Sequence, residues 1–192
     1  MKKNLRQQIQ ARRAQLTEGD IRRSSLKLVG LVDTLLHSQG PCTVAIYHPF
    51  RNEPNLLSLL SNPDLRGFQW ALPVCNEGNT EGGLGGSADA FLDFALFSKD
   101  SALQTGKYGI PVPVSPVMVK PDVMLIPCLG FHREGARLGY GAGWYDRTLS
   151  RMVVKPFTVG ICFAEDEIAD SFTEAHDHIL DAIVTPQEII VV

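Results

Sequence analysis

Short apolar segments alternate with amphipathic segments along most of the chain. The apolar runs typical of buried strands fall at residues 43–47, 68–74, 90–97, 122–127, 157–162, 181–184 and 188–192. Helical spacing of apolar positions is found at residues 2–16, after Thr17, in a short stretch at 55–60, and at 144–152. Near-continuously apolar strands that alternate with helices predict an α/β fold: a mainly parallel sheet with helices on both faces, in a Rossmann-like three-layer architecture.

The helix after Thr17 has the clearest boundaries. Thr17 with Asp20 three positions later resembles a capping box, and Gly40 is typical of a helix end. Between these signals, one apolar face is formed by Leu28, Val29, Val32, Leu35 and Leu36. We therefore expect a long amphipathic helix that packs against the sheet.

A glycine-rich segment from Arg137 to Asp146 follows the predicted strand at 122–127 and leads into the helix at 144–152. A glycine turn that opens a helix directs free N–H groups and the positive end of the helix dipole outward, which suits an anion. Arg137 adds a forked cation, and Asp146 suggests a bridging cation such as Mg²⁺. The segment predicts a nucleotide-phosphate site with a metal, although a tight strand-to-helix turn is the alternative interpretation.

The segment is neither of the two common phosphate-binding motifs. Trp144 and Tyr145 stand where a Walker A loop needs its lysine and hydroxyl residue, and the third glycine of the dinucleotide fingerprint is missing. A second glycine-rich stretch satisfies GxGxxA with Gly83, Gly85 and Ala88. Because no strand leads into it and a strand pattern leads out, we expect a flexible loop at 76–87 without a cofactor role.

Composition narrows the functional classes. The chain has 192 residues, of which 44% are hydrophobic, so we expect one domain spanning 1–192. The net charge of −3 does not favour electrostatic binding to nucleic acid or to a membrane surface. The N-terminus lacks the apolar core of a signal peptide, and the four cysteines form no CxxC pair. We expect a cytoplasmic protein with reduced thiols, and a monomer.

The sequence from Pro127 to Asp146 closely resembles the 5-formyltetrahydrofolate cyclo-ligase (methenyltetrahydrofolate synthetase) family. Weaker landmarks occur in the same order elsewhere: the basic N-terminal helix, Tyr47-His48 through Glu53, the turn from Lys107 to Pro111, and the stretch from His176 to Pro186. The resemblance implies ATP-dependent conversion of 5-formyltetrahydrofolate to 5,10-methenyltetrahydrofolate, with Mg²⁺ as cofactor. It also implies that no protein nucleophile is needed.

The resemblance also implies roles for individual residues. ATP would be bound by Lys2, Arg6, Arg137, Leu138, Gly139, Tyr140, Gly141, Ala142, Gly143, Trp144 and Tyr145, and Mg²⁺ by Asp146 and Asp177. Arg137 and Tyr145 are the catalytic candidates. His48, Glu53 and Tyr108 would bind the substrate, since a carboxylate accepts paired N–H donors well and an aromatic ring can stack on the pterin. Arg12 and Arg13 are interpreted as solvated helix charges.

Two positions depart from the usual pattern of that family, and two other functions stay open. His132 stands where an aspartate is common, and Ala142 where a glycine or lysine is usual. A sugar-phosphate or CoA-binding enzyme of related architecture would need a catalytic carboxylate near a strand end, for which Glu53 is the candidate. A nucleic-acid-binding module would use the basic N-terminal helix, and the negative net charge argues against it.

Overall fold

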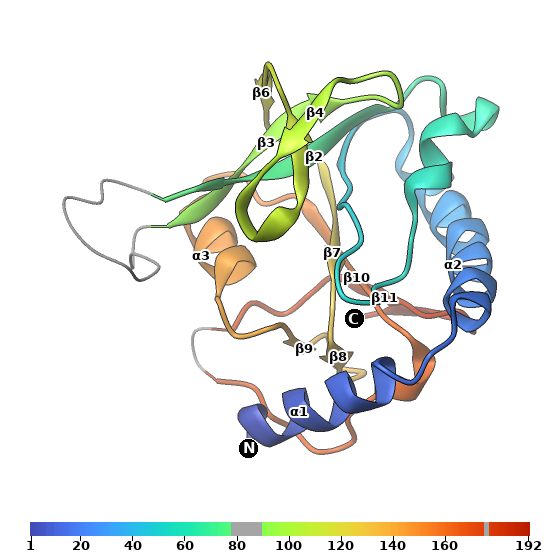
Figure 1. Cartoon of the computed structure of the whole chain (residues 1–192), viewed down its shortest axis with the longest axis vertical. Coiled ribbons are helices and arrows are strands. Elements are labelled where there is room, and N and C mark those ends of the chain that lie inside the picture. Colours follow the sequence, from blue (N-terminus) through green and yellow to red (C-terminus); the bar gives the residue numbers. More distant parts are fainter. Residues whose placement is uncertain (78–89, 175–176) are drawn as a thin grey trace.

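An eight-stranded sheet forms the centre of the computed structural model, which describes residues 1–77, 90–174 and 177–192 (Figure 1). In sheet order the strands are β12 (Ile189–Val191), β11 (Ala182–Val184), β10 (Phe157–Ile161), β7 (Val123–Pro127), β1 (Thr43–Ala45), β2 (Gln69–Asn76), β3 (Phe91–Phe97) and β6 (Met118–Val119). The five strands from β11 to β2 are parallel, and the pairs at both edges are antiparallel. The predicted mainly parallel sheet is confirmed.

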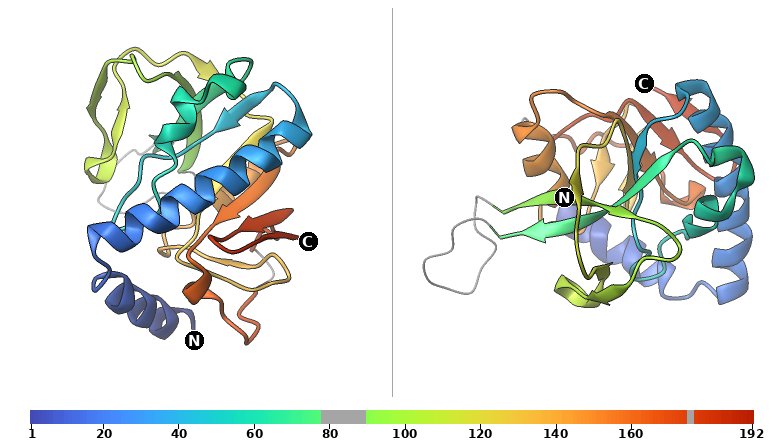
Figure 2. Two further views of the ribbon diagram at one scale, coloured as in Figure 1. Left: turned by 90° about the vertical axis from the view of Figure 1, so that its right-hand side faces the viewer. Right: turned by 90° about the horizontal axis from the view of Figure 1, so that it is seen from above.

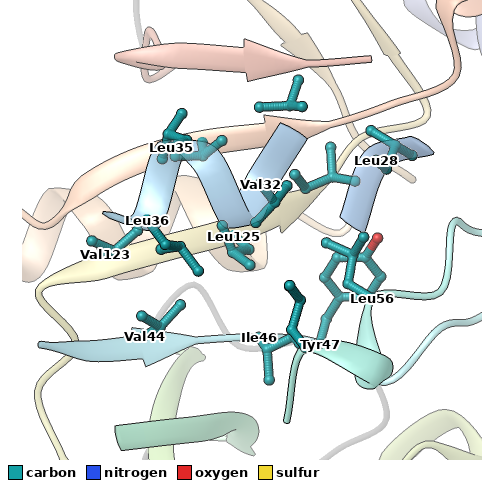
Figure 3. Packing of buried hydrophobic residues seen from close by; sticks show 14 of the residues in the cluster. Leu28, Val32, Leu35, Leu36, Val44, Ile46, Tyr47, Leu56, Val123 and Leu125 are labelled. Atoms are coloured by element: carbon teal, nitrogen blue, oxygen red, sulfur yellow. The ribbon is translucent and has the colours of Figure 1, made fainter. Parts of the chain in front are cut away.

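Helices cover both faces of this sheet, as the sequence predicts. On one face α2 (Glu18–Gln39) packs its apolar stripe against residues of β1 and β7 (Figure 3). On the other face α3 (Trp144–Arg151) buries Leu149 against Met124 and Ile126 of β7 (Figure 1). Successive residues of β7 therefore point into two different apolar layers, which explains why that strand is apolar throughout.

The boundaries of α2 follow from its capping residues. The Thr17 hydroxyl accepts a hydrogen bond from the Asp20 N–H, and the Asp20 carboxylate accepts one from the Thr17 N–H, so the capping box is complete. The helix ends at Gly40, whose φ of 73° is accessible to glycine. The predicted start and end of this helix are confirmed.

The first helix, α1 (Lys2–Arg13), lies on neither face of the sheet. It crosses the end of the sheet from which the carboxyl ends of the parallel strands emerge (Figure 2). Ile9 packs there against Leu129, Leu138 and Phe172. Beside it, β8 (Gly130–Phe131) and β9 (Arg137–Leu138) form a small hairpin. In open α/β sheets this is the end at which ligands bind.

Several boundaries differ from the sequence prediction. The helix predicted at 2–16 ends at Arg13. The N–H groups of Gln15 and Leu16 bond to carbonyls three residues earlier, which is the tighter 3₁₀ pattern. The helix predicted at 55–60 is a 3₁₀ helix, η1 (Leu57–Ser61), and the other 3₁₀ turns are η2 (Pro63–Leu65), η3 (Lys107–Gly109) and η4 (Ala164–Asp166). Short strands β4 (Leu103–Thr105) and β5 (Pro111–Pro113) form a second hairpin that was not predicted. Most of the predicted loop at 76–87 lies outside the described residues, and so do Gly83, Gly85 and Ala88.

Candidate active site

A pocket of about 740 Å³ opens at the carboxyl ends of β1, β2 and β7. All sixteen residues predicted for the site line it. They are Lys2, Arg6, His48, Glu53, Tyr108, residues 137–146 and Asp177. Residues separated by more than 170 positions in sequence therefore lie around one cavity, because α1, the strand ends and the glycine-rich segment meet there.

The glycine-rich segment forms the wall of the pocket between β9 and α3. Gly141 and Gly143 have φ values of 100° and 66°, which favour glycine over other residues. A side chain at Gly141 would also meet the Arg6 guanidinium at 3.3 Å. Gly143 is the N-cap of α3 and provides no side-chain cap, so the first turn of this helix directs its N–H groups toward the pocket wall. This arrangement is suited to an anionic group.

Arg137 and Asp146 form the central ion pair of the pocket. The Arg137 Nη2 donates to Asp146 Oδ1 at 2.5 Å, and its Nη1 donates to the His178 carbonyl at 2.9 Å. The Arg137 side chain is only 5% exposed, whereas that of Asp146 is 27% exposed. Arg137 is therefore held rigidly at the base of the glycine segment, with its carboxylate partner nearer to solvent.

The first turns of α1 supply two more cations. Lys2 Nζ donates to Asp177 Oδ2 at 2.6 Å and lies 3.1 Å from Glu174. Arg6 Nε donates to the Gly139 carbonyl at 2.8 Å, so this guanidinium lies against the glycine segment. Lys2 and Arg6 are one helical turn apart and face the same pocket, as predicted.

Glu53 is a buried carboxylate of the same pocket, beside Tyr140. It is 5% exposed, and its Oε2 accepts a hydrogen bond of 2.8 Å from the Phe50 N–H. Burial raises the pKa of Glu53 to about 7, although the Phe50 N–H and Arg13 both favour its charged form. Near neutral pH this group is therefore divided between the acid and the carboxylate.

Aromatic rings also line the pocket. Trp144 and Tyr108 lie near each other, with 3.4 Å from the indole Nε1 to the Tyr108 hydroxyl, and Lys107 Nζ lies 5.1 Å from the centre of the Trp144 ring. Tyr108 is 55% exposed and has a φ of 60°. Burial raises the pKa of Tyr145, so its hydroxyl stays protonated and can donate a hydrogen bond.

The chain matches a family profile over nearly its whole length. The profile of the 5-formyltetrahydrofolate cyclo-ligase family covers residues 1–186. The chain belongs to this family. The resemblance found in the sequence is confirmed.

Individual cyclo-ligases agree with this assignment. The chain is 31% identical to the 5-formyltetrahydrofolate cyclo-ligase of Mycolicibacterium smegmatis over 155 residues, which are 78% of this chain and 76% of that protein. It is 25% identical to that of Haemophilus influenzae over 182 residues, 92% of each chain. The solved structure of 5,10-methenyltetrahydrofolate synthetase from Aquifex aeolicus is similar with a TM-score of 0.79 and 28% identity, over 99% of this chain and 92% of that one.

One interpretation of the sequence is wrong within this cyclo-ligase chain. Arg13 is not a solvated helix charge: it is 2% exposed and donates to Asp166 and to the carbonyls of Cys128 and Leu129. Arg12 is exposed, but it too is paired with Asp166. Helical periodicity could not predict the burial of Arg13, because Arg13 is the last residue of α1 and the groups around it come from segments distant in sequence.

Three further cations line the cyclo-ligase pocket and were not predicted. They are Arg51, Lys107 and Arg147. Arg147 lies on α3 one turn after Gly143, and its Nε donates to the Ala90 carbonyl at 2.5 Å. The position of Arg147 in the helix that follows the glycine segment was the available signal, whereas nothing local marks Arg51 or Lys107 as pocket residues.

Metal-binding and nucleophilic groups were searched for among the described residues. No group of three or more His, Cys, Asp or Glu side chains is arranged there to hold a metal ion, and His176 lies outside that part of the chain. All four cysteines are free thiols. Burial raises the pKa of Cys42, Cys75, Cys128 and Cys162, which disfavours the reactive thiolate form.

We predict that Glu53 makes the cyclo-ligase less stable as the pH rises. The unfolded chain ionises Glu53 near pH 4.5, whereas the folded chain keeps the proton up to about pH 7. Stability is therefore lost between these values, and Glu53→Gln should raise the free energy of unfolding by about 3 kcal/mol at pH 8 but not below pH 4.5. Urea denaturation of both proteins at several pH values measures this difference. Glu165→Gln, which changes an exposed carboxylate, is the control, and a pH-independent effect of Glu53→Gln would contradict the prediction.

Proposed function

We propose that this chain converts 5-formyltetrahydrofolate and ATP into 5,10-methenyltetrahydrofolate, ADP and phosphate. The observation that supports it most is the pocket that joins a helix-opening glycine segment and six cations to a buried carboxylate flanked by aromatic rings. A nucleotide phosphate chain and a pterin need these two kinds of surface side by side. Membership of the cyclo-ligase family supports the same reaction.

The chemistry explains why both substrates must share one cavity. The formyl oxygen is a poor leaving group, so it first attacks the γ-phosphorus of ATP and ADP leaves. The neighbouring aniline nitrogen of the same folate then attacks the activated carbon, loses its proton and expels phosphate as the ring closes. Positioning and electrostatic stabilisation of the transferred phosphoryl group account for catalysis, and no protein nucleophile takes part.

The glycine end of the pocket is assigned to ATP. The N–H groups of residues 139–143 and the start of α3 would bind the phosphates, and Lys2 and Arg6 would neutralise them. Arg137 is the proposed catalytic cation, because its side chain is fixed by the His178 carbonyl and Asp146. A held guanidinium stabilises developing charge without reorganising. Tyr145 would donate a hydrogen bond to the reacting groups.

The part of the pocket around Glu53 and Tyr108 is assigned to the folate. Glu53 as a carboxylate would accept the paired N–H donors of the pterin. Tyr108 and Trp144 would stack on a ring of the substrate, and His48 would line the same end. Ala142 is exposed on the glycine segment, so the departure there changes the edge of the phosphate site and not its backbone geometry.

Magnesium fits the acids of the pocket. Mg²⁺ is usually held by one or two carboxylates together with substrate phosphates and water, so a closed set of three protein ligands is not required. Asp146 and Asp177 both line the pocket, and each is already paired with a cation that would also bind phosphate. We propose that these two acids hold Mg²⁺, which would neutralise the phosphate charge when bound.

The remaining expectations belong to the same proposal. We propose one catalytic unit over residues 1–192, acting as a monomer in the cytoplasm on small-molecule substrates, without nucleic acid or membrane partners. No helix among the described residues is long and apolar enough to cross a membrane. Lys2 and Arg6 line the pocket and Arg13 is buried, so three of the five basic residues of α1 are not available to a nucleic acid.

The decisive experiment is a direct assay. Purified protein with 5-formyltetrahydrofolate, ATP and Mg²⁺ should develop the near-ultraviolet absorbance of methenyltetrahydrofolate, and reactions lacking ATP should not. If folded protein binds ATP but forms no product, the phosphate site serves another acceptor. The sugar-phosphate interpretation would then replace this proposal.

We predict that Arg137→Ala lowers turnover by on the order of 10² to 10³, because a positioned cation stabilises the transition state by a few kcal/mol. The matched control is Arg133→Ala, which changes an exposed arginine in the turn between β8 and β9. Melting temperatures verify that both variants are folded. A normal rate for folded Arg137→Ala would remove this residue from the mechanism.

We predict that Asp146→Asn raises the Mg²⁺ concentration needed for half-maximal ATP binding by about tenfold, because a neutral amide is a weaker ligand for a hard cation. Titration of Mg²⁺ at fixed ATP, followed by calorimetry, measures this shift. Asp64→Asn is the control, since Asp64 is also a first-turn helix acid but does not line the pocket. Equal metal titrations for Asp146→Asn and the wild type would restrict Asp146 to favouring the dipole of α3.

A further inference from the structure

Arg13 is a buried cation at the last position of α1. Its Nε donates to Asp166 Oδ2 at 2.8 Å, and its Nη2 donates to the Cys128 and Leu129 carbonyls at 2.7 and 3.1 Å. Its guanidinium also lies 5.0 Å from the centre of the Phe163 ring. These contacts fix the end of α1 to the carboxyl ends of β7 and β10.

One nitrogen of this guanidinium remains unused. Arg13 Nη1 is buried and makes no hydrogen bond with the part of the chain that the structure describes. Leaving a buried polar atom unsatisfied is unfavourable, and such atoms are rare enough to indicate a functional constraint. Tyr140, whose hydroxyl lies beside Glu53, lines both the substrate pocket and a smaller cavity that Arg13 also lines.

Arg13 also holds the turn that carries Glu53. The Asn52 Nδ2 donates to the Arg13 carbonyl at 3.0 Å, and the Phe50 N–H donates to Glu53 Oε2. Arg51 and Asn52 have φ values of 48° and 60°, an uncommon conformation for residues other than glycine. A strained turn persists only when its surroundings hold it in place.

Packing between this turn and α1 is incomplete, because a small cavity of about 230 Å³ lies there. Arg13, Arg51, Asn52 and Tyr140 are among the residues that line the cavity. Arg51 lies over the rings of Phe50 and Tyr140, and the hydrogen bond from Asn52 to the Arg13 carbonyl joins the turn to the end of α1.

We propose that Arg13 is a positioning residue for the pterin end of the substrate: it holds the turn at 50–53 and places a buried positive charge near Glu53, the group that would accept pterin N–H donors. The inference rests on the proposed function, since it names how the folate end of that site is maintained. Arg13 itself does not line the substrate pocket, so it acts through Glu53 and Asn52.

The charges around Glu53 single out Arg13. The titratable groups that face this carboxyl are Arg13, Tyr47, Cys128, Tyr140 and Tyr145. Burial raises the pKa of each of the tyrosines and of Cys128, so they are neutral at pH 6 to 9. Arg13 lowers the pKa of Glu53 against the opposite effect of burial, and removing it should therefore raise this pKa above about 7.

The test is binding of 5-formyltetrahydrofolate without ATP, measured by calorimetry from pH 6 to 9, alongside binding of ATP with Mg²⁺. For the wild type we expect folate affinity to rise with pH through about 7. Arg13→Met should move that midpoint upward by about one pH unit and weaken folate binding about fivefold at pH 7, with ATP binding changed less than about twofold. Arg12→Met is the matched control, because Arg12 shares the Asp166 partner but is exposed.

Two results would overturn the proposal. One is an unchanged pH midpoint in folded Arg13→Met, and the other is an equal loss of folate and ATP binding, which would mean that Arg13 only secures α1. If Arg13→Met does not fold, Asn52→Gly keeps the positive φ and removes only the contact with the Arg13 carbonyl. This variant should weaken folate binding about 3-fold or more without affecting ATP binding. Equal effects on both ligands would refute the proposal. A wild type that binds no 5-formyltetrahydrofolate would instead refute the proposed function.

Discussion

The attachment of α1 across the carboxyl ends of the parallel strands is the constraint on which the site depends. Strand ends leave carbonyl groups without sheet partners, and Arg13 satisfies two of them while Asp166 balances its charge. Apolar contacts of Ile9 secure the middle of the helix. A helix of 12 residues is about 18 Å long, so its first turn reaches the glycine segment while its last residue lies at the turn that carries Glu53. One rigid element therefore contacts both the glycine segment and the turn that carries Glu53.

Two cations of the pocket are paired with acids before any ligand binds. Lys2 is bonded to Asp177, and Arg137 to Asp146, so two of the three cations proposed to bind phosphate are matched by the acids proposed to bind Mg²⁺. A free phosphate chain would have to compete with these carboxylates, and a free cation would have to compete with Lys2 and Arg137. A nucleotide that arrives with its metal could exchange both partners together. Under the proposed function, this arrangement would favour the metal–nucleotide complex over either component alone.

Local signals were sufficient for much of this structure, whereas sixteen of the residues that border the pocket were named mainly from the family resemblance. The capping residues of α2, the apolar strands and the glycine segment each encode their conformation within a few neighbouring positions. Arg13 and the turn at 50–53 could not be found in this way. The burial of Arg13 comes from β7, β10 and η4, which are more than a hundred residues away, and Arg51 has no sequence signal for a positive φ. Two-residue strands such as β8 and β9 likewise depend on the hairpin that their contacts create.

Ionisation of Glu53 has opposite effects on the stability of the fold and on the proposed binding of folate. Its buried carboxyl favours the protonated form up to about pH 7, so ionisation destabilises the folded chain. The proposed role in binding the pterin needs the ionised form, because only a carboxylate accepts both N–H donors. The substrate would then supply the hydrogen bonds that burial denies to the empty site. As the pH rises, folding stability should therefore fall while folate affinity rises. If Glu53 had only a structural role, its ionisation would change the stability and leave folate affinity unchanged.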